Sequence, residues 1–245
     1  MKKKRTLARQ LIRGSYKLDL IISAIIPAFN EEERIVKTLL AVKKIDIISK
    51  IYVIDDGSKD NTAIEVSTLE DILLIKNPEN RGKGKALSIG INAAIDSSDI
   101  IVLLDGDLEE SAIEAIKLIK PILNNEADVT IAKFPPAKKK GGFGLVKKLA
   151  KYGVYMKTKV KLDTVLSGQR AFKKDVIKSI NYNYEGFEIE LAMTIDILNK
   201  GYIIKEVEVN MKHNETGRNI KDFLHRGKQF YHIAKTLINR NFINN

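Results

Sequence analysis

Asp105 and Asp107 stand two residues apart around Gly106, directly after the apolar run IIVLL. Two carboxylates that face one pocket without a partner repel each other and lose hydration. A hard divalent cation removes that cost because it prefers oxygen ligands. The pair therefore predicts a cation site, although its spacing does not match the 12-residue loop of an EF-hand. Glu109 and Glu110, just beyond it, fit the ordinary role of acids in the first turn of a helix.

Three further polar segments follow apolar runs in the same manner. They are residues 27–31 (PAFNE), 55–58 (DDGS) and 81–85 (RGKGK). Each has a purely structural explanation, because Asp, Gly and Ser favour turns and helix caps and the lysines could line an exposed helix entrance. In an open parallel sheet, however, ligands bind where the carboxyl ends of the strands meet. We therefore predict one nucleotide-type site, in which Asp56 could accept a hydrogen bond from a base and Lys83 could supply positive charge.

Two common nucleotide-binding motifs are missing from these segments. The stretch RGKGKAL lacks the G-x-x-x-x-G-K-[ST] spacing of a Walker A loop. The turn after the first apolar run, PAFNEEE, lacks the G-x-G-x-x-G fingerprint of a nicotinamide dinucleotide site. We therefore expect neither a P-loop nor a nicotinamide cofactor.

Apolar runs and amphipathic stretches alternate regularly over residues 20–133. We expect strands at 20–29, 50–56, 71–77, 99–105 and 127–134. We expect helices at 31–44, 57–69, 81–95 and near 110–123, the last ending around Pro121. This alternation predicts an α/β protein with a mostly parallel sheet and right-handed crossovers. Further along we expect a helix at 143–160, an irregular basic stretch, a helix at 185–201, a strand at 202–211 and a C-terminal helix at 220–240.

The length of 245 residues and the hydrophobic content of 44% suit one globular unit with a sizeable core. We divide the chain into a basic N-terminal segment at 1–18 and a single domain at 19–245. That domain has a nucleotide-binding half at 19–133 and an acceptor half at 134–245. The chain has no cysteine and no apolar stretch near the ~20 residues of a membrane helix. These features predict a cytoplasmic protein.

Positive charge is concentrated in two regions of a chain whose net charge is +11. Residues 1–17 hold seven basic and no acidic side chains, and residues 133–178 hold fourteen basic side chains against two acidic ones. An anionic substrate or the inner face of an acidic membrane suits them, through 1–18 and Lys138–Lys140. Two solvated lysine-rich surfaces are the alternative. No nucleic-acid-binding motif is present, so nucleic acid is not an expected partner. The oligomeric state, a homodimer included, stays open.

The polar segments, taken in order, resemble a known family. The stretches IIPAFNEEERI, VIDDGSKDNT, NRGKGKAL and LLDGDL resemble the successive motifs of family 2-type glycosyltransferases with the GT-A (nucleotide-diphospho-sugar transferase) fold. LSGQRAF, GFEIELAM and EVEVNMKHNETGR are similar to segments of dolichyl- and polyprenyl-phosphate sugar synthases and of glucosyl-3-phosphoglycerate synthases. The resemblance covers roughly residues 20–230. It implies a glycosyltransferase that uses Mg²⁺ or Mn²⁺ and a nucleotide-diphosphate sugar, with UDP-glucose or a similar donor expected.

The same resemblance implies a role for each matching residue. The nucleotide-sugar side consists of Pro27, Ala28, Phe29, Glu31, Asp56, Lys83, Asp105 and Gly106. The implied metal ligands are Asp107 and His213. The implied catalytic residues are Glu190, which contacts the donor sugar, together with Asp105 and Asp107. The acceptor side consists of Gly168, Gln169, Arg170 and Arg218. The resemblance thus implies that the end of the fourth strand and the distant segment MKHNE meet in space.

Several alternatives stay open. Phe143 and Gly144 stand where the phosphoglycerate-type enzymes carry a basic residue, so the acceptor could be a polyprenyl phosphate or another small phosphorylated or cell-envelope compound. An inverting enzyme needs a general base, for which Glu190 is the first candidate, ahead of Asp163 and Glu188. A retaining enzyme of the phosphoglycerate type, or one with a phosphate acceptor, needs none. A sugar-phosphate nucleotidyltransferase and a non-catalytic domain that binds polyanions or membranes are the remaining interpretations.

Overall fold

The computed structural model describes residues 20–135, 145–183, 189–212 and 237. The expected basic segment at 1–18 and the cluster Lys138–Lys140 lie outside these ranges. So does the expected C-terminal helix, apart from Leu237. Among the described residues, no helix is long and apolar enough to cross a lipid bilayer.

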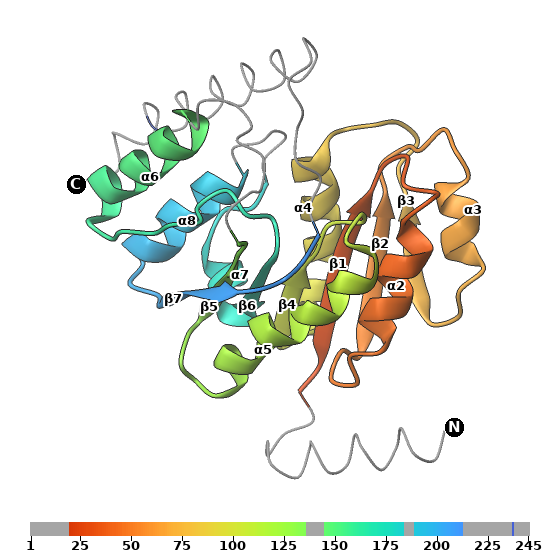
Figure 1. Cartoon of the computed structure of the whole chain (residues 1–245), viewed down its shortest axis with the longest axis horizontal. Helices are drawn as coiled ribbons and strands as arrows, with labels where there is room; N and C mark the ends of the chain where they lie inside the picture. The colour runs from red at the N-terminus through yellow and green to blue at the C-terminus, as the bar shows by residue number, and fades with distance from the viewer. Residues whose placement is uncertain (1–19, 136–144, 184–188, 213–236, 238–245) are drawn as a thin grey trace.

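A seven-stranded sheet crosses the centre of the molecule in the order β3-β2-β1-β4-β6-β5-β7 (Figure 1). The strands are β1 (Ile22–Ala28), β2 (Lys50–Asp55), β3 (Ile72–Lys76), β4 (Ile100–Leu103), β5 (Val129–Lys133), β6 (Arg170–Lys173) and β7 (Ile204–Glu208). The first four are parallel to one another, and β5 is parallel to β7. Continuous apolar runs form the central strands because helices cover both faces of the sheet. The predicted α/β fold with a mostly parallel sheet is confirmed.

Strand β6 is the element that the sequence did not predict. It lies where we expected an irregular basic stretch, and it runs antiparallel between β4 and β5. A short helix, α7 (Lys174–Ser179), follows it directly. A strand of four residues is too short to show a clear alternation of apolar and polar side chains. The fifth expected strand therefore does not lie beside the fourth, because β6 separates them.

Helices cover the two faces of the sheet as separate groups. The helices are α2 (Ile35–Lys43), α3 (Thr62–Ser67), α4 (Lys83–Ala94), α5 (Ala115–Leu123), α6 (Leu145–Thr158), α7 and α8 (Ile189–Asn199), with 3-10 turns η1 (Ile95–Ser97) and η2 (Glu109–Glu114). The helix expected near 110–123 is thus η2 followed by α5. It continues past Pro121 to Leu123, because a proline in the last turn removes one backbone hydrogen bond without ending the helix.

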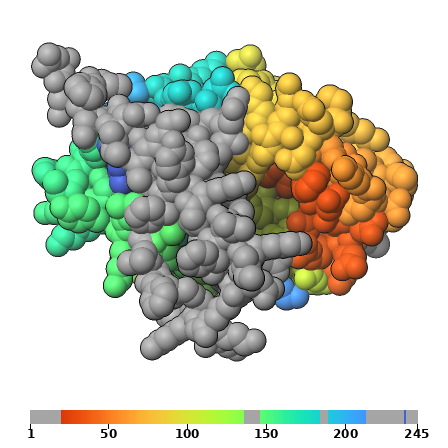
Figure 2. Space-filling view, turned by 90° about the horizontal axis from the view of Figure 1, so that it is seen from above, coloured from red at the N-terminus to blue at the C-terminus, as the bar shows by residue number. Residues whose placement is uncertain are grey.

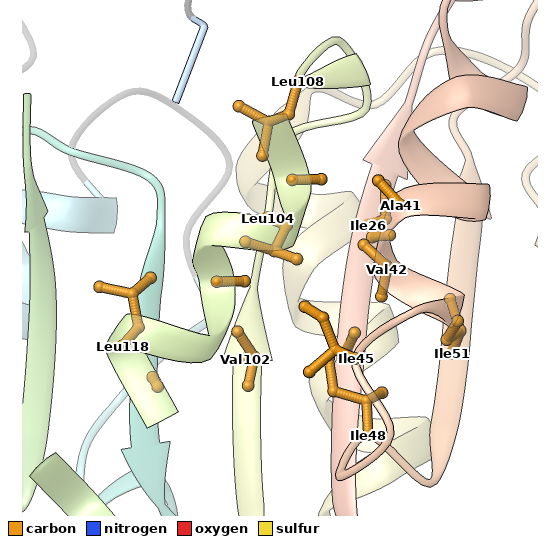
Figure 3. Packing of buried hydrophobic residues seen from close by; sticks show 14 of the residues in the cluster. Ile26, Ala41, Val42, Ile45, Ile48, Ile51, Val102, Leu104, Leu108 and Leu118 are labelled. Atoms are coloured by element: carbon orange, nitrogen blue, oxygen red, sulfur yellow. The ribbon is translucent and has the colours of Figure 1, made fainter. Parts of the chain in front are cut away.

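The core consists of one apolar layer on each face of the sheet. One layer packs α2, η2 and α5 against β1, β2 and β4, and Figure 3 shows its centre around Ile26, Val102, Leu104 and Leu118. The other layer packs α4, α7 and α8 against the opposite face. A smaller cluster joins α6 to the outer side of α8. These layers hold the strand ends rigidly, which fixes the loops that follow them.

Candidate active site

The carboxyl ends of β1, β2 and β4 meet at one edge of the sheet, together with the amino end of the antiparallel strand β6. Figure 2 looks down on this edge, where the end of the β4 region lies recessed between the red β1–α2 region and the yellow α4 region. Because β6 runs the opposite way, it begins here, and Gln169 just before it lies next to Asp105. The predicted convergence of strands one, two and four at this edge is present in the structure, and β6 adds an unpredicted contribution.

Lys83 joins the two predicted carboxylates Asp105 and Glu190. Its Nζ lies 2.7 Å from Asp105 Oδ1 and 3.6 Å from Glu190 Oε1. Lys83 is the first residue of α4, and Glu190 lies in the first turn of α8. Burial lowers the pKa of Lys83, but the two carboxylates outweigh burial and hold that pKa above its ordinary value. The lysine is therefore a permanent cation between strand β4 and helix α8.

Gln169 holds the other side of Asp105. Its Nε2 donates to Asp105 Oδ2, and its Oε1 accepts from the Ser167 hydroxyl, which fixes the orientation of the amide. Gly168 lies against the same ion pair, since a Cβ there would stand 2.5 Å from Lys83 Nζ and 3.3 Å from Asp105 Oδ1. Gly168 and Gln169, which we assigned to the acceptor side, thus contact the donor-side pair of Lys83 and Asp105.

Asp107 and Glu31 form an acidic corner beside this network. Burial raises the pKa of Asp107, and the neighbouring Asp105 raises it further, against the opposing charges of Arg34 and Lys83. Burial also raises the pKa of Glu31, opposed by Arg34 and assisted by Asp107. Arg34 Nη2 lies 2.7 Å from Glu31 Oε2, yet the contact lacks hydrogen-bond geometry, and that buried oxygen accepts no hydrogen bond from the described residues. An arrangement of this kind favours a bound cation.

The backbone geometry brings the acidic corner close to strand β1. Gly106 packs so tightly that a Cβ would lie 3.2 Å from the carbonyl oxygen of Pro27 and 3.6 Å from Cγ of Glu31. Pro27 and Ala28 end β1, and the Asp56 amide donates to the Ala28 carbonyl oxygen. The predicted donor-side residues from three strands therefore lie within one compact region.

The carboxylates around Asp107 form an open corner and not a closed metal cage. Within the described part of the chain, no three histidine, cysteine, aspartate or glutamate side chains form a metal-binding group. His213 lies outside the described residues. Mg²⁺ is commonly held by one or two carboxylates while substrate phosphates and water complete its shell. The carboxylate donor set of Asp107 and its neighbours fits a hard divalent cation on this basis.

Lys212, which directly precedes His213, lies beside the start of η2, the turn that follows the acidic corner. Lys212 donates from its backbone amide to the Ser111 hydroxyl at 2.8 Å, and its Nζ lies 3.4 Å from Glu109. Ser111 is four residues after Asp107 in the chain. Glu109 and Glu110 begin the 3-10 turn η2, as predicted for acids at a helix start. Lys212 of the segment MKHNE thus lies beside η2, which follows Asp107, and the meeting of His213 with Asp107 stays a prediction.

Asp56 differs from the other predicted carboxylates because groups of its own chain already donate hydrogen bonds to it. Its side chain is buried, and it accepts hydrogen bonds from Asn77 Nδ2 and from the backbone amides of Arg81 and Gly82 at 2.8 to 3.1 Å. These bonds fix the glycine-rich loop at the start of α4. In this structure Asp56 therefore positions Lys83, which stands next to Gly82.

A hollow of about 650 Å³ opens at the ends of β1 to β3. Phe29, which is exposed, lines it together with Asp55, Lys76 and Asn80. Its size and its position at the carboxyl ends of these strands suit a nucleoside. Asp56 does not line it.

The position of Arg170 corrects one expectation. We placed Arg170 on an acceptor-side loop, whereas it begins β6 and is 1% exposed. Its guanidinium donates to the carbonyl oxygens of Ser167 and Val165 and to the Thr194 hydroxyl of α8. Burial lowers its pKa to about 10, opposed by the charge of Glu190. Arg170 therefore holds the loop before β6 against α8. Arg218, the other predicted acceptor-side arginine, lies outside the described residues.

Two site residues were not predicted from the sequence. Arg34 opposes the charge of Glu31 and Asp107, and Ser167 orients Gln169. The spacing of Glu31 and Arg34, three residues apart at the start of a helix, was the available signal for the first. Asp163, a reserve candidate for the general base, is exposed and pairs with Lys133 and Lys151, away from this network. Glu188 lies outside the described residues.

Comparisons with known proteins agree on one family. A profile described as "Glycosyl transferase family 2" matches residues 23–180. The chain is 28% identical over 221 residues to the UDP-N-acetylglucosamine–dolichyl-phosphate N-acetylglucosaminyltransferase of Methanococcus voltae, covering 79% of this chain and 86% of that protein. It is 27% identical over 232 residues to the glucosyl-3-phosphoglycerate synthase of Petrotoga mobilis, covering 83% of this chain and 69% of that protein.

The fold is similar to that of a solved enzyme. The crystal structure of glucosyl-3-phosphoglycerate synthase from Mycobacterium tuberculosis, in complex with Mn²⁺, UDP and glucosyl-3-phosphoglycerate, superposes with a TM-score of 0.76 at 22% identity. The match covers 94% of this chain and 83% of that one. The GT-A fold implied by the sequence motifs is therefore confirmed.

Proposed function

Because this chain belongs to glycosyl transferase family 2, we propose that it transfers a hexose from a UDP-linked donor to a phosphate-bearing acceptor, with Mg²⁺ or Mn²⁺ at Asp107. The chain is a glycosyltransferase of the hexosyltransferase class. Family membership disfavours the nucleotidyltransferase and the non-catalytic interpretations of the sequence. The donor, the metal and the acceptor are the proposed parts.

The observation that carries the proposal is the acidic corner of Asp107, Asp105 and Glu31. Their mutual repulsion and burial raise the pKa of Asp107 and of Glu31, so the metal-free corner favours cation binding. A bound divalent metal would neutralise charge that develops on the leaving diphosphate. Asp107 would hold it, with His213 as the proposed second protein ligand.

Lys83 and its partners would position the donor. The ammonium lies between Asp105, which follows β4, and Glu190 in the first turn of α8. A fixed cation at this place stabilises negative charge on a sugar diphosphate without reorganising during the reaction. Gln169 keeps Asp105 from rotating, and Asp56 keeps the loop before Lys83 in place.

A phosphate acceptor suits Glu190 as an orienting group. Its carboxylate stands 3.6 Å from the Lys83 ammonium and is mostly buried. A phosphate oxygen is already anionic and attacks without a general base, so Glu190 is free to bind the donor sugar. Dolichyl phosphate is the acceptor in the name of the Methanococcus voltae relative, and we propose a polyprenyl phosphate here. Phosphoglycerate, named in the Petrotoga mobilis relative, is the second candidate.

Ligand-dependent thermal stability tests the donor and the metal. We expect UDP-sugars with Mn²⁺ to raise the melting temperature, since a ligand at about 100 times its Kd adds ~2.7 kcal/mol. For a chain of this size that corresponds to roughly 5–10 °C. Asp107→Ala should abolish the Mn²⁺-dependent part of the shift. If the variant keeps that part, the metal assignment is wrong, and if no nucleotide sugar shifts the wild type, the donor assignment is wrong.

Product analysis tests the acceptor. Radiolabelled sugar should move from the donor found above to a polyprenyl phosphate, and the product should partition into organic solvent. Transfer to 3-phosphoglycerate alone would replace the polyprenyl phosphate as acceptor and leave the donor and metal proposals standing.

A further inference from the structure

Helix α6 exposes a row of large apolar side chains. Tyr152 is 62% exposed, Met156 47% and Tyr155 39%, and Val160 just beyond the helix is 39% exposed. Large side chains are usually turned inward when a helix belongs to a core. A group of four on one short segment therefore marks a surface for contact with something else.

These side chains occupy one face of the helix. Lys148, Tyr152, Tyr155, Met156 and Lys159 are spaced by four, three, one and three residues, which places them on a single stripe at 3.6 residues per turn. The opposite face packs into the protein, with Ala150 and Val154 against Leu191 and Ile195 of α8. Figure 1 shows α6 lying along α8 on the side away from the sheet. The Tyr–Met stripe is thus the exposed face of α6, on the side opposite α8, while Leu237 lies against Gly153 on the flank of the helix.

The charge carried by residues 145–161 has one sign. Residues 145–161 contain six lysines and no acidic residue. Lys161 Nζ lies 5.7 Å from the centre of the Tyr155 ring, so lysine and tyrosine side chains are neighbours on this surface. Two copies of the chain meeting through this face would bring like charges together, which opposes a dimer contact. An anionic partner is complementary.

We propose that the Tyr–Met stripe of α6 docks on an anionic lipid bilayer. Tyrosine rings sit well at the boundary between headgroups and acyl chains, and apolar neighbours add buried area. Each lysine near an anionic membrane adds about 1 kcal/mol of attraction. A helix with both features on one face lies in the membrane surface without crossing it.

Ion pairs of Asp163 join α6 to the end of β5. Asp163 accepts from Lys151 of α6 and from Lys133 at the carboxyl end of β5. The parallel strands β4 and β5 end at the same edge of the sheet, where Asp105 and Asp107 lie. Helix α6 is therefore joined to the edge of the sheet that carries the site. The use of docking for an acceptor rests on the proposed function, whereas the docking itself does not.

Vesicle co-sedimentation of the full chain tests the surface. Wild type should bind vesicles of mixed phosphatidylcholine and phosphatidylglycerol and bind pure phosphatidylcholine vesicles far more weakly. The triple variant Tyr152→Ser, Tyr155→Ser, Met156→Ser should bind the mixed vesicles about tenfold or more weakly. The variant Lys148→Gln, Lys159→Gln should lose about fivefold per lysine.

A matched control tests whether vesicle binding depends on this surface or on exposed apolar side chains anywhere on the protein. The triple variant Leu40→Ser, Ile64→Ser, Leu73→Ser removes three equally exposed apolar side chains, 45%, 61% and 47% exposed, from α2, α3 and β3. It should bind mixed vesicles as wild type does. If the α6 triple variant also binds as wild type does, or if wild type does not bind mixed vesicles, the proposal is overturned.

Two further measurements separate the remaining outcomes. Sedimentation velocity detects a dimer, and a wild-type dimer that the α6 variant dissociates without a change in vesicle binding would assign this face to a second copy. The UDP-sugar thermal shift should be the same in the α6 variant and in wild type. Loss of vesicle binding with an unchanged shift supports docking, whereas unchanged vesicle binding with an unchanged shift overturns docking and leaves the donor proposal intact.

Discussion

Two acidic pairs follow two parallel strands of the same sheet, and the protein uses them in opposite ways. After β2, Asp56 is buried and accepts hydrogen bonds from one side chain and two backbone amides of its own loop. After β4, Asp107 forms no ion pair with the described residues, and burial and Asp105 raise its pKa. Asp105 is intermediate in the number of its partners: Lys83 forms an ion pair with it, and Gln169 donates a hydrogen bond to it.

The contrast shows that the hydrogen-bond donors around an acidic pair, more than the carboxylates themselves, decide whether the pair stabilises a loop or stays open to a ligand. The loop at residues 77–82 returns over the end of β2 and presents N–H groups to Asp56. At the end of β4 the chain turns directly into η2, and the nearest cations are shared among several acids. A carboxylate held by several donors of its own chain stabilises a loop, whereas one without an ion-pair partner remains available to a ligand.

The largest expected effect comes from removing the satisfied carboxylate. Asp56→Ala leaves the amides of Arg81 and Gly82 and the amide side chain of Asn77 without their acceptor. We expect the free energy of unfolding to fall by about 3 kcal/mol, and the melting temperature by roughly 6–12 °C. Urea and thermal unfolding measure this loss. A loss no larger than that of an ordinary surface substitution would mean that Asp56 does not hold the loop.

A smaller loss is expected at the partly satisfied position. Lys83→Met leaves Asp105 and Glu190 facing each other without their shared cation. Because the lysine side chain is about a third exposed, solvent screens part of the effect, and we expect a loss of about 1–2 kcal/mol. Lys85→Met is the matched control on the same helix, since among the described residues Lys85 donates only to Asn183, at 3.4 Å. Equal losses in the two variants would contradict the bridging role of Lys83.

The smallest effect, with the opposite sign, is expected at Asp107. Its pKa is raised in the folded protein, so the ionised carboxylate favours the unfolded state. In metal-free protein near neutral pH, Asp107→Asn should leave the free energy of unfolding unchanged or raise it, by no more than about 0.5 kcal/mol. This advantage should shrink as the pH falls through the raised pKa, because the wild-type carboxyl then becomes neutral as well.

Urea unfolding in EDTA from about pH 7 to about pH 4 measures this pH dependence. Asp56→Asn is the comparison, since it should be less stable than wild type in the upper part of that range. A marked loss of stability in Asp107→Asn would show that Asp107, like Asp56, has a structural partner.

Much of the fold followed from periodicity along the chain. The first four strands are long apolar runs bounded by turn residues, and the helices between them have clear amphipathic spacing, so both could be predicted. Strand β6 could not, because it has four residues and its partners are fixed only by tertiary packing. Missing β6 also hid the true place of Arg170, which the resemblance assigned to an acceptor-side loop although each of its three guanidinium nitrogens donates a hydrogen bond inside the protein.

The site was predictable where a motif lies at a strand end and not where it depends on contacts between distant segments. The positions of Asp105, Lys83 and Glu31 follow from the rule that ligands meet the carboxyl ends of parallel strands. The bond from Gln169 to Asp105 joins residues 64 positions apart. The hydrogen bonds from Arg81 and Gly82 to Asp56 depend on the path by which their loop comes back over the end of β2. Composition does not predict that path.

The place of β5 in the sheet has a consequence for how the chain can be made and divided. Its neighbours are β6 and β7, both from the C-terminal part, so a chain that stops at residue 133 has no strand to pair with it. During synthesis this apolar strand waits unpaired, and unpaired strand edges are prone to aggregate. The predicted boundary at residue 133 is therefore not a place to cut the chain. Expressed alone, residues 19–133 should aggregate, and co-expression with the C-terminal part should rescue them.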